Sequence, residues 1–171
     1  MKVWIIQGSL NPKSNTSNLT KAFEEKLKQE NIDYDYIDLR NINMEFCDWR
    51  DLYDYSQEVQ DVYERMQKCD TFVIGMPVYQ YTLSWALKNF LDIMCGAMYQ
   101  KAFAILTSSG STRAYMSVSD LVDLLFFEVE WIPVPPVVHI TLQEWQTDLL
   151  NDEQVNLKMS DIITNLKKIN N

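Results

Sequence analysis

Several residue types are scarce in this sequence, and each scarcity excludes a class of protein. The chain has 171 residues but only 4 glycines, 3 cysteines and 1 histidine. Cys47, Cys69 and Cys95 lie far apart and form no Cys-x-x-Cys pair. This argues against a disulfide framework and favours a reducing, cytoplasmic compartment. A lone His139 excludes a histidine-cluster metal site, and we predict no bound metal.

Long apolar runs and positive charge are lacking too. No run of about 18 apolar residues occurs, so we predict no membrane span. The net charge is −9, which makes nucleic acid and anionic membranes poor partners. A phosphate ligand must therefore be held by local groups. The length fits a single domain over residues 1–171.

Short apolar runs indicate strands. Residues 3–6, 71–74 and 102–106 are continuous apolar runs, which suit strands buried on both faces of a parallel sheet. Residues 32–36 alternate between polar and apolar side chains, as an edge strand does. A last strand is predicted over residues 137–141.

Helical spacing separates these strands. Apolar residues recur at intervals of three and four, the pattern of amphipathic helices, in residues 19–27, 59–66, 83–94, 118–125 and 155–169. Alternating strands and helices predict right-handed β-α-β units. We predict an α/β fold, a flavodoxin-like three-layer sandwich whose five-stranded parallel sheet has the order 2-1-3-4-5. Residues 41–55 are the least regular segment, and we expect Trp49 and Tyr53 to fold it onto the body.

The segment after the first strand is rich in hydroxyl groups. In such sheets ligands bind beyond the carboxyl ends of the strands, where the strand order reverses, here between the first and third strands. The segment also leads into a helix, whose N-terminal N–H groups and dipole favour an anion. We predict that Ser9, Ser14 and Thr16, with Lys13, hold a phosphate. The alternative is that Ser14 or Asn15 is an ordinary N-cap and Ser9 a turn former.

Two further loops are expected to face this one. Residues 75–82 (GMPVYQYT) leave the third strand, and Tyr79 and Tyr81 offer flat apolar faces with polar tips to a planar heteroaromatic ligand. Alternatively, the two tyrosines only cap the sheet. Residues 107–112 (TSSGST) leave the fourth strand and would complete the wall. Alternatively, residues 107–112 are only a polar turn before a helix that starts near Arg113.

These three loops resemble those of one superfamily. Residues 8–16 (GSLNPKSNT) resemble the phosphate loop of NAD(P)H-dependent FMN reductases and of the related quinone reductases. Residues 77–81 (PVYQY) with 87–92 (LKNFLD) resemble the second loop and helix of those families, and residues 107–111 stand where they carry a Gly-rich loop. Residues 133–139 (PVPPVVH) resemble a segment of the quinone-reductase branch.

The resemblance implies a flavoenzyme that binds FMN, usually as a homodimer. The phosphate would lie at Ser9, Ser14, Asn15 and Thr16. The isoalloxazine ring would lie against Pro77, Val78, Tyr79, Gln80 and Tyr81 and against Ser108, Ser109, Gly110 and Ser111. Hydride would pass from NAD(P)H to flavin N5, and electrons then to a small-molecule acceptor: a quinone, an azo compound, free flavin or a metal ion.

The sequence departs from the family pattern at four places. Tyr81 stands where a small residue or an Asn-Gly pair is frequent. Asn11 and Lys13 occupy a region where an Arg is common, which predicts weaker phosphate affinity. Ser108 and Ser109 replace glycines, so their side chains are expected to narrow the approach to the ring. Some relatives have a cysteine motif for an iron–sulfur cluster, but Cys47 stands alone and we predict none.

Other side chains near the predicted site receive less specific roles. Tyr81 and Tyr115 are expected to form a substrate wall. Arg113 is a candidate contact for nicotinamide-nucleotide phosphates, although a solvated Arg at a helix start is the commoner case. Hydride transfer requires close contact rather than an acid or base, so we predict no catalytic proton donor and a structural role for His139. We expect Trp131 and Trp145 to be core or dimer-interface anchors, not flavin stackers.

Three functions are compatible with the sequence. The first is an NAD(P)H-dependent FMN or quinone reductase. The second is a non-enzymatic FMN electron carrier of the flavodoxin type, for which the acidic surface would suit basic partners. The third is a scaffold that has lost its cofactor, which the Gly-poor third loop keeps open. Residues 8–16 are longer than the Thr-rich turn of a carrier, which favours the enzyme.

Overall fold

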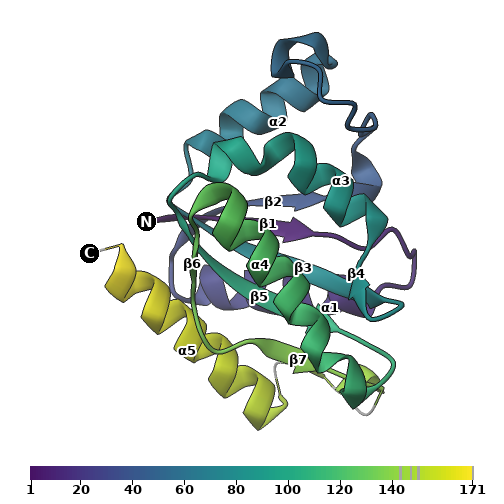
Figure 1. Cartoon of the computed structure of the whole chain (residues 1–171). Coiled ribbons are helices and arrows are strands. Elements are labelled where there is room, and N and C mark those ends of the chain that lie inside the picture. Colours follow the sequence, from purple (N-terminus) through teal and green to yellow (C-terminus); the bar gives the residue numbers. More distant parts are fainter. Residues whose placement is uncertain (143, 147, 150, 171) are drawn as a thin grey trace.

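A parallel sheet lies between two layers of helices in the computed structural model of the chain (Figure 1). Residues 1–142, 144–146, 148–149 and 151–170 are described. The strands are β1 (Lys2–Gln7), β2 (Asp33–Asp38), β3 (Thr71–Tyr79), β4 (Thr82–Leu83), β5 (Ala102–Ser108), β6 (Ile132–Pro133) and β7 (Val138–Ile140). The α-helices are α1 (Asn15–Gln29), α2 (Gln57–Gln67), α3 (Trp85–Met94), α4 (Val118–Val129) and α5 (Glu153–Ile169). The short 3-10 helices are η1 (Leu39–Asn41), η2 (Leu52–Asp54), η3 (Cys95–Met98), η4 (Thr112–Ser117) and η5 (Glu144–Gln146).

The sheet has the predicted flavodoxin-like order with additional short strands. Its path is β2-β1-β3-β5-β6, and β4 pairs with β3 while β7 pairs with β5. The prediction of five strands was therefore approximate, because β6 and β7 together occupy the fifth position. The chain between them contains Pro135 and Pro136, which have no N–H to donate, so this stretch leaves the ladder.

Each face of the sheet is covered by its own hydrophobic core. Side chains of β1, β3 and β5 that include Trp4, Phe72 and Phe103 pack against α2, α3 and α4. Alternate side chains of the same strands, with Leu19 and Ile162, form the second core under α1 and α5. The apolar periodicity predicted both layers, because every helix turns its apolar stripe to the sheet. None of the described helices is both long and apolar enough to cross a bilayer.

Two local predictions were wrong. Leu83, placed in the third helix by its spacing, lies in β4, and α3 begins at Trp85. In residues 41–55, Trp49 and Tyr53 are 83% and 74% exposed, whereas Tyr55 is buried at 5%. This segment is attached to the body by Asn89, whose side chain accepts from Cys47 N at 2.8 Å and donates to Glu45 O at 2.8 Å. Polar contacts to α3 and the burial of Tyr55, rather than of Trp49 and Tyr53, therefore hold it.

Candidate functional site

The carboxyl ends of β1 and β3 meet through two glycines. Gly8 N donates to Gly75 O at 2.9 Å. A Cβ at Gly8 would lie 2.8 Å from that oxygen, and a Cβ at Gly75 would lie 2.4 Å from Thr20 Cγ2. Only glycine permits this approach, which places residues 9–16 beside the end of β3. The crevice predicted between the first and third strands is therefore present.

The residues predicted to contact the cofactor line two small neighbouring cavities, except Lys13, which is exposed and lines neither. The first, of about 90 Å³, is lined by Ser9, Asn11, Ser14, Asn15, Thr16, Pro77, Val78, Tyr79, Ser108, Ser109, Gly110 and Trp145. The second, of about 170 Å³, is lined by Val78, Gln80, Tyr81, Ser109, Gly110, Ser111 and Ala114. Ligand pockets usually measure about 300–1,000 Å³, so each of the two cavities is smaller than a usual ligand pocket.

The first loop presents neutral donors to the smaller cavity. Ser14 is the N-cap of α1, and its Oγ accepts from Ser17 N at 3.0 Å. The N-cap interpretation of Ser14 is thus correct, but its O–H still has a proton to donate. The N–H groups of Asn15 and Thr16 have no intrahelical acceptor because they belong to the first turn. A phosphate group fits this donor set, because its oxygens would accept hydrogen bonds from the N–H groups that have no intrahelical acceptor, without the help of a cation.

Hydroxyl bonds tie the three predicted loops together. Ser9 Oγ and Tyr79 Oη share a hydrogen bond at 3.1 Å. Thr16 Oγ1 and Ser108 Oγ share another at 2.6 Å. The first loop is thereby attached to both the second and the third, and the three segments form one surface at the carboxyl edge of the sheet.

The second loop is a strand and a tight hairpin rather than an irregular loop. β3 continues through Pro77 to Tyr79, and β4 pairs with it antiparallel, Tyr79 opposite Thr82. Gln80 and Tyr81 form the two-residue turn with φ of 50° and 65°. This left-handed pair is the geometry for which Asn-Gly is preferred. It leaves the Tyr81 side chain 63% exposed at the rim of the larger cavity.

The serines of the third loop turn inward. Ser108 and Ser109 are 6% and 3% exposed. Ser108 Oγ bonds to Thr16, and Ser109 Oγ donates to Ser111 O at 2.7 Å. Their hydroxyls are engaged within the protein, but both side chains still line the smaller cavity, so the expectation that they narrow the approach to the ring stays a prediction. A Cβ on Gly110 would meet nothing within 4 Å, so the outer side of this loop is open.

Two of the predicted substrate residues, Arg113 and Tyr115, lie on η4, next to the larger cavity. Arg113 and Tyr115 are exposed. The Tyr115 ring meets the His139 ring edge-on, with centroids 5.6 Å apart. His139 Nε2 lies 3.0 Å from Ser109 Oγ. Because Ser109 Oγ donates to Ser111 O, this contact is best satisfied with the proton on Nε2, and burial lowers the pKa of His139 below its ordinary value.

The two tryptophans differ in their positions. Trp131 is 1% exposed, stacks on Phe72 with ring centroids 5.3 Å apart and packs against the tilted ring of Phe103 at 4.9 Å, which confirms a core role. Trp145 is half-buried against the second core and also lines the smaller cavity. This position could not be predicted from the sequence, because no recognisable motif surrounds Trp145.

Sequence reasoning also missed a polar network behind the first loop. Gln7 Nε2 donates to Ser9 O at 2.8 Å and to Asp38 Oδ1 at 2.9 Å. Asp38 in turn holds Arg40, whose guanidinium reaches Ser17 Oγ at 3.0 Å. The only signal in the sequence was that two charged residues, Asp38 and Arg40, follow the second predicted strand. The alternation of polar and apolar residues in that strand did not single them out.

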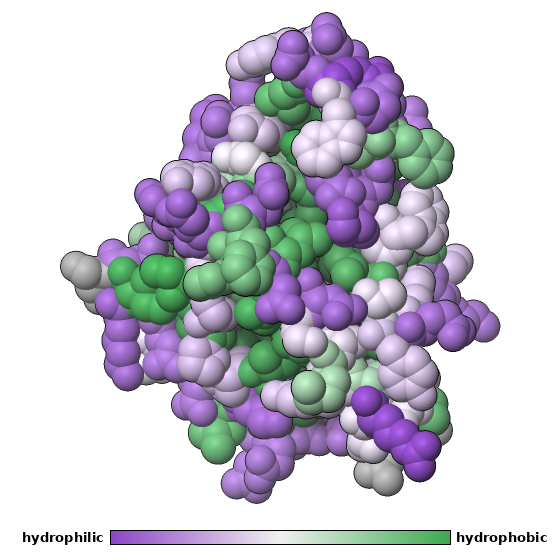
Figure 2. Space-filling model, in the orientation of Figure 1, coloured by the Kyte–Doolittle hydropathy of each residue, from purple (hydrophilic) through white to green (hydrophobic). Residues whose placement is uncertain are grey.

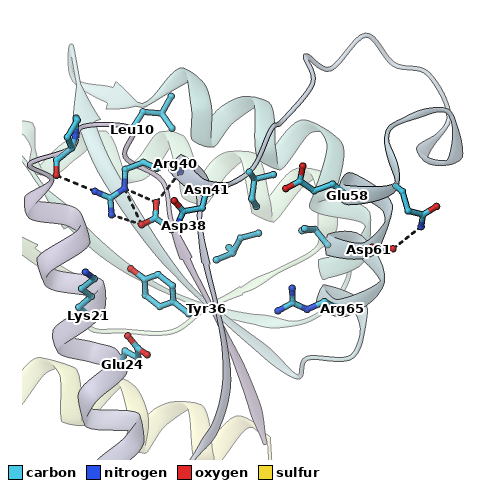
Figure 3. A pocket seen from close by; sticks show the side chains of 15 residues that line it. Leu10, Lys21, Glu24, Tyr36, Asp38, Arg40, Asn41, Glu58, Asp61 and Arg65 are labelled. Carbon is cyan, nitrogen blue, oxygen red and sulfur yellow. Dashed lines mark hydrogen bonds and ion pairs between the residues drawn. The ribbon is translucent and has the colours of Figure 1, made fainter.

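A wider hollow lies elsewhere, along the edge of β2. It measures about 1150 Å³ and is bounded by α1 on one side and α2 on the other (Figure 3). Lys21 and Glu24 of α1 face Asp61 and Arg65 of α2 across it. Of the predicted cofactor residues none lines it, so its size does not make it the site that the sequence indicates.

Comparison with known proteins identifies the family. The profile of the family described as NADPH-dependent FMN reductase matches residues 1–144. The chain belongs to this family. Its description contains the cofactor and the donor that the sequence resemblance implied, FMN and NADPH.

Two curated relatives match about half of the chain. An NAD(P)H-dependent FAD/FMN reductase of Geobacillus thermodenitrificans is 30% identical over 90 residues, which cover 52% of this chain and 49% of that protein. An iron-sulfur flavoprotein of Archaeoglobus fulgidus is 33% identical over 97 residues, 54% of this chain and 48% of that protein. The matched region thus spans about half the length of either relative.

Solved structures share the fold. An NADH:FMN oxidoreductase in its apo form has a TM-score of 0.78 at 18% identity, over 98% of this chain and 89% of that one. A flavoenzyme NAD(P)H:acceptor oxidoreductase of Paracoccus denitrificans has a TM-score of 0.78 at 16% identity, over 99% and 97%. An archaeal flavodoxin has a TM-score of 0.67 at 17% identity, over 100% of both chains. The predicted flavodoxin-like fold is confirmed.

Proposed function

We propose that this family member is an NAD(P)H-dependent oxidoreductase that holds FMN in the crevice between β1, β3 and β5. The observation that carries the proposal is the convergence of three loops, predicted separately, on two adjoining cavities. The smaller cavity takes the phosphate at Ser9, Ser14, Asn15 and Thr16. The larger one takes the ring edge beside Gln80, Tyr81 and Ser111.

The exposed rim of the larger cavity agrees with the chemistry of such an enzyme. Bound FMN supplies hydride and electron transfer, and the protein orients it. Tyr81 and Tyr115 are exposed beside the larger cavity and the outer side of Gly110 is free, so a nicotinamide or a flat acceptor can approach within stacking distance. Arg113, exposed on η4, is placed to meet a nucleotide phosphate. The acceptor is a quinone, an azo compound, free flavin or a similar small molecule.

We also propose a homodimer in a reducing, cytoplasmic compartment. The outer faces of α3 and α4 carry Trp85, Phe126 and Phe127, which are 60%, 54% and 80% exposed. Figure 2 views this side and shows apolar side chains gathered at its centre among polar ones. Exposed aromatic surface of this kind favours a protein interface. The chain's three cysteines are free thiols, as suits a reducing compartment.

An absorbance experiment tests the enzyme proposal. The purified protein is loaded with FMN, freed of excess cofactor and mixed anaerobically with NADPH or NADH. We expect the visible flavin band to bleach and to recover when a quinone is added. A flavin that stays oxidised with both donors would contradict the enzyme and indicate a carrier. A protein that takes up no FMN would indicate a scaffold.

A further inference from the structure

Arg40 holds the first loop from outside the crevice. It lies in η1, directly after the carboxyl end of β2, and its guanidinium points toward residues 9–17 (Figure 3). Nη1 donates to Asn11 O at 3.3 Å and to Pro12 O at 3.4 Å. Nη2 donates to Ser17 Oγ at 3.0 Å. One side chain therefore joins the middle of the loop to the first turn of α1.

Asp38 and Gln7 fix the other end of the loop. Asp38 accepts from Arg40 Nε at 2.9 Å and from Gln7 Nε2 at 2.9 Å. Gln7 is fully buried, and its amide group exchanges two bonds with Ser9: Nε2 donates to Ser9 O at 2.8 Å and Oε1 accepts from Ser9 N at 2.6 Å. The hydrogen-bonded series Ser9, Gln7, Asp38 and Arg40 thus connects the start of the loop to α1, which follows it.

The pair supplies geometry rather than charge. The side chains of Asp38 and Arg40 are only 10% and 24% exposed, and the carboxylate neutralises the guanidinium. Burial alone would raise the pKa of Asp38, but hydrogen bonds from the side chain and backbone of Arg40 outweigh it and lower that pKa. Both groups therefore stay ionised and paired at neutral pH. The donors of Arg40 are directed at the loop and at Asp38, not at the cavity.

We infer that Asp38 and Arg40 are positioning residues that preset the first loop for a phosphate ester. They hold the backbone so that Ser9, Ser14, Asn15 and Thr16 line the smaller cavity together. The inference rests on the proposed binding of FMN. Its consequence is selectivity: the pair favours FMN over riboflavin, which lacks the phosphate.

Flavin affinity measured on the apoprotein tests this. Kd values for FMN and riboflavin are obtained by flavin fluorescence titration for the wild type, Arg40→Met, Arg40→Lys and the control Arg65→Met. Arg65 is a matched control because it lines the same hollow and pairs with Asp35 at 3.0 Å, away from the loop. Because Arg40→Met removes a charge-assisted hydrogen-bond network, the Kd for FMN should rise about 10- to 100-fold in this variant. The Kd for riboflavin should change less than about 2-fold. Arg65→Met should change neither.

Arg40→Lys separates geometry from charge. Lysine keeps the cation but has no planar fork, so we expect it to lose FMN affinity about as much as Arg40→Met. Full FMN affinity in Arg40→Lys would overturn the geometric role. Urea unfolding of each apoprotein shows whether it is folded. If Arg40→Met is not folded, Ser17→Ala takes its place, because, of the contacts of Arg40, it removes only the one with Ser17 Oγ. It should still raise the Kd for FMN about 3- to 10-fold, but not the Kd for riboflavin.

The outcomes distinguish this inference from the proposed function. A wild type that binds FMN no better than riboflavin would contradict the phosphate site itself. A wild type that prefers FMN, with the preference unchanged in folded Arg40→Met, would overturn the positioning role alone. Equal losses for both flavins in Arg40→Met would also overturn it, because they would indicate a general structural role.

Discussion

The two ends of the crevice are built in opposite ways. At the proposed phosphate end, Gln7, Asp38 and Arg40 support the loop from behind, and Ser9 and Ser14 of the loop are 2% and 5% exposed. At the proposed ring end, Gln80 and Tyr81 form a turn in left-handed conformations, with Tyr81 63% exposed. One end is buried and hydrogen-bonded, whereas the other is exposed and strained.

This difference matches what each end would have to do. A phosphate group is the same in every catalytic cycle, and a rigid set of donors binds it without reorganisation. The ring end would receive a donor and then an acceptor of a different shape, so it benefits from an open wall. Strained backbone at a ligand-facing turn is a known accompaniment of function. The following predictions test the contrast, from the largest expected effect to the smallest.

The largest effect is expected at the rigid end, from Gly75→Ala. Its new Cβ would lie 2.4 Å from Thr20 Cγ2 and 3.0 Å from Ile6 O. Thr20 cannot easily yield, because its Oγ1 bonds to Ser17 O and to Tyr36 Oη at 3.1 and 2.8 Å. Overpacking of this kind should lower the free energy of unfolding by about 3 kcal/mol, measured by urea unfolding.

Gly110→Ala is the control at the ring end. Its Cβ would meet nothing within 4 Å, and no described glycine has a positive φ. Its free energy of unfolding should stay within about 0.5 kcal/mol of the wild type. Equal losses in the two variants would refute the contrast between a close-packed and an open end.

The second effect has the opposite sign and lies in the hairpin turn. A non-Gly residue in the left-handed region costs about 1–2 kcal/mol, and Asn-Gly is the pair that such two-residue turns prefer. Replacing Gln80 by Asn and Tyr81 by Gly together should therefore raise the free energy of unfolding by about 1–2 kcal/mol. Tyr81→Phe is the control, because it keeps the ring and the strain.

The same double variant should weaken the proposed substrate wall. It removes the exposed Tyr81 ring, so the KM for a planar acceptor should rise while FMN stays bound. A double variant that is less stable than the wild type would show that the turn is not strained. A double variant that is more stable but has an unchanged KM for the acceptor would show that Tyr81 is not part of the substrate wall.

The sequence predicted the layers better than the details of the site. Continuous apolar runs located β1, β3 and β5, because strands buried on both faces have no polar side to alternate with. The loops of the crevice followed from the topology. The hairpin was missed because Gln80-Tyr81 lacks the Asn-Gly signature, and Pro77 suggested the end of a strand that continues to Tyr79.

The network behind the first loop could not be predicted for a different reason. Gln7 and Asp38 lie 31 positions apart in the chain, and only the parallel register of β1 and β2 sets them side by side. A charged residue at the end of an edge strand is usually solvated. Nothing local therefore distinguished Arg40 from a surface arginine.

The smallest effect is expected in the pH dependence of stability, and it should separate the two ends. At the ring end, burial lowers the pKa of His139 from its ordinary 6.5, and the opposing influence of Glu144 does not restore it. As the pH falls below 6.5, the unfolded chain takes up a proton that the folded chain resists, so stability is lost. At the phosphate end the pKa of Asp38 is lowered from 3.8. Its contribution is complete above that value and is lost only at more acidic pH.

His139→Gln isolates the ring end in this titration, because Gln can donate to Ser109 Oγ but does not ionise. Urea midpoints between pH 7 and pH 5 should fall less in His139→Gln than in the wild type. Asp38→Asn should match the wild-type slope in that range and diverge only below about pH 4. Identical slopes for wild type and His139→Gln would show that the imidazole is not held neutral by burial. The ring end would then be less closely packed around His139 than its contacts with Ser109 and Tyr115 indicate.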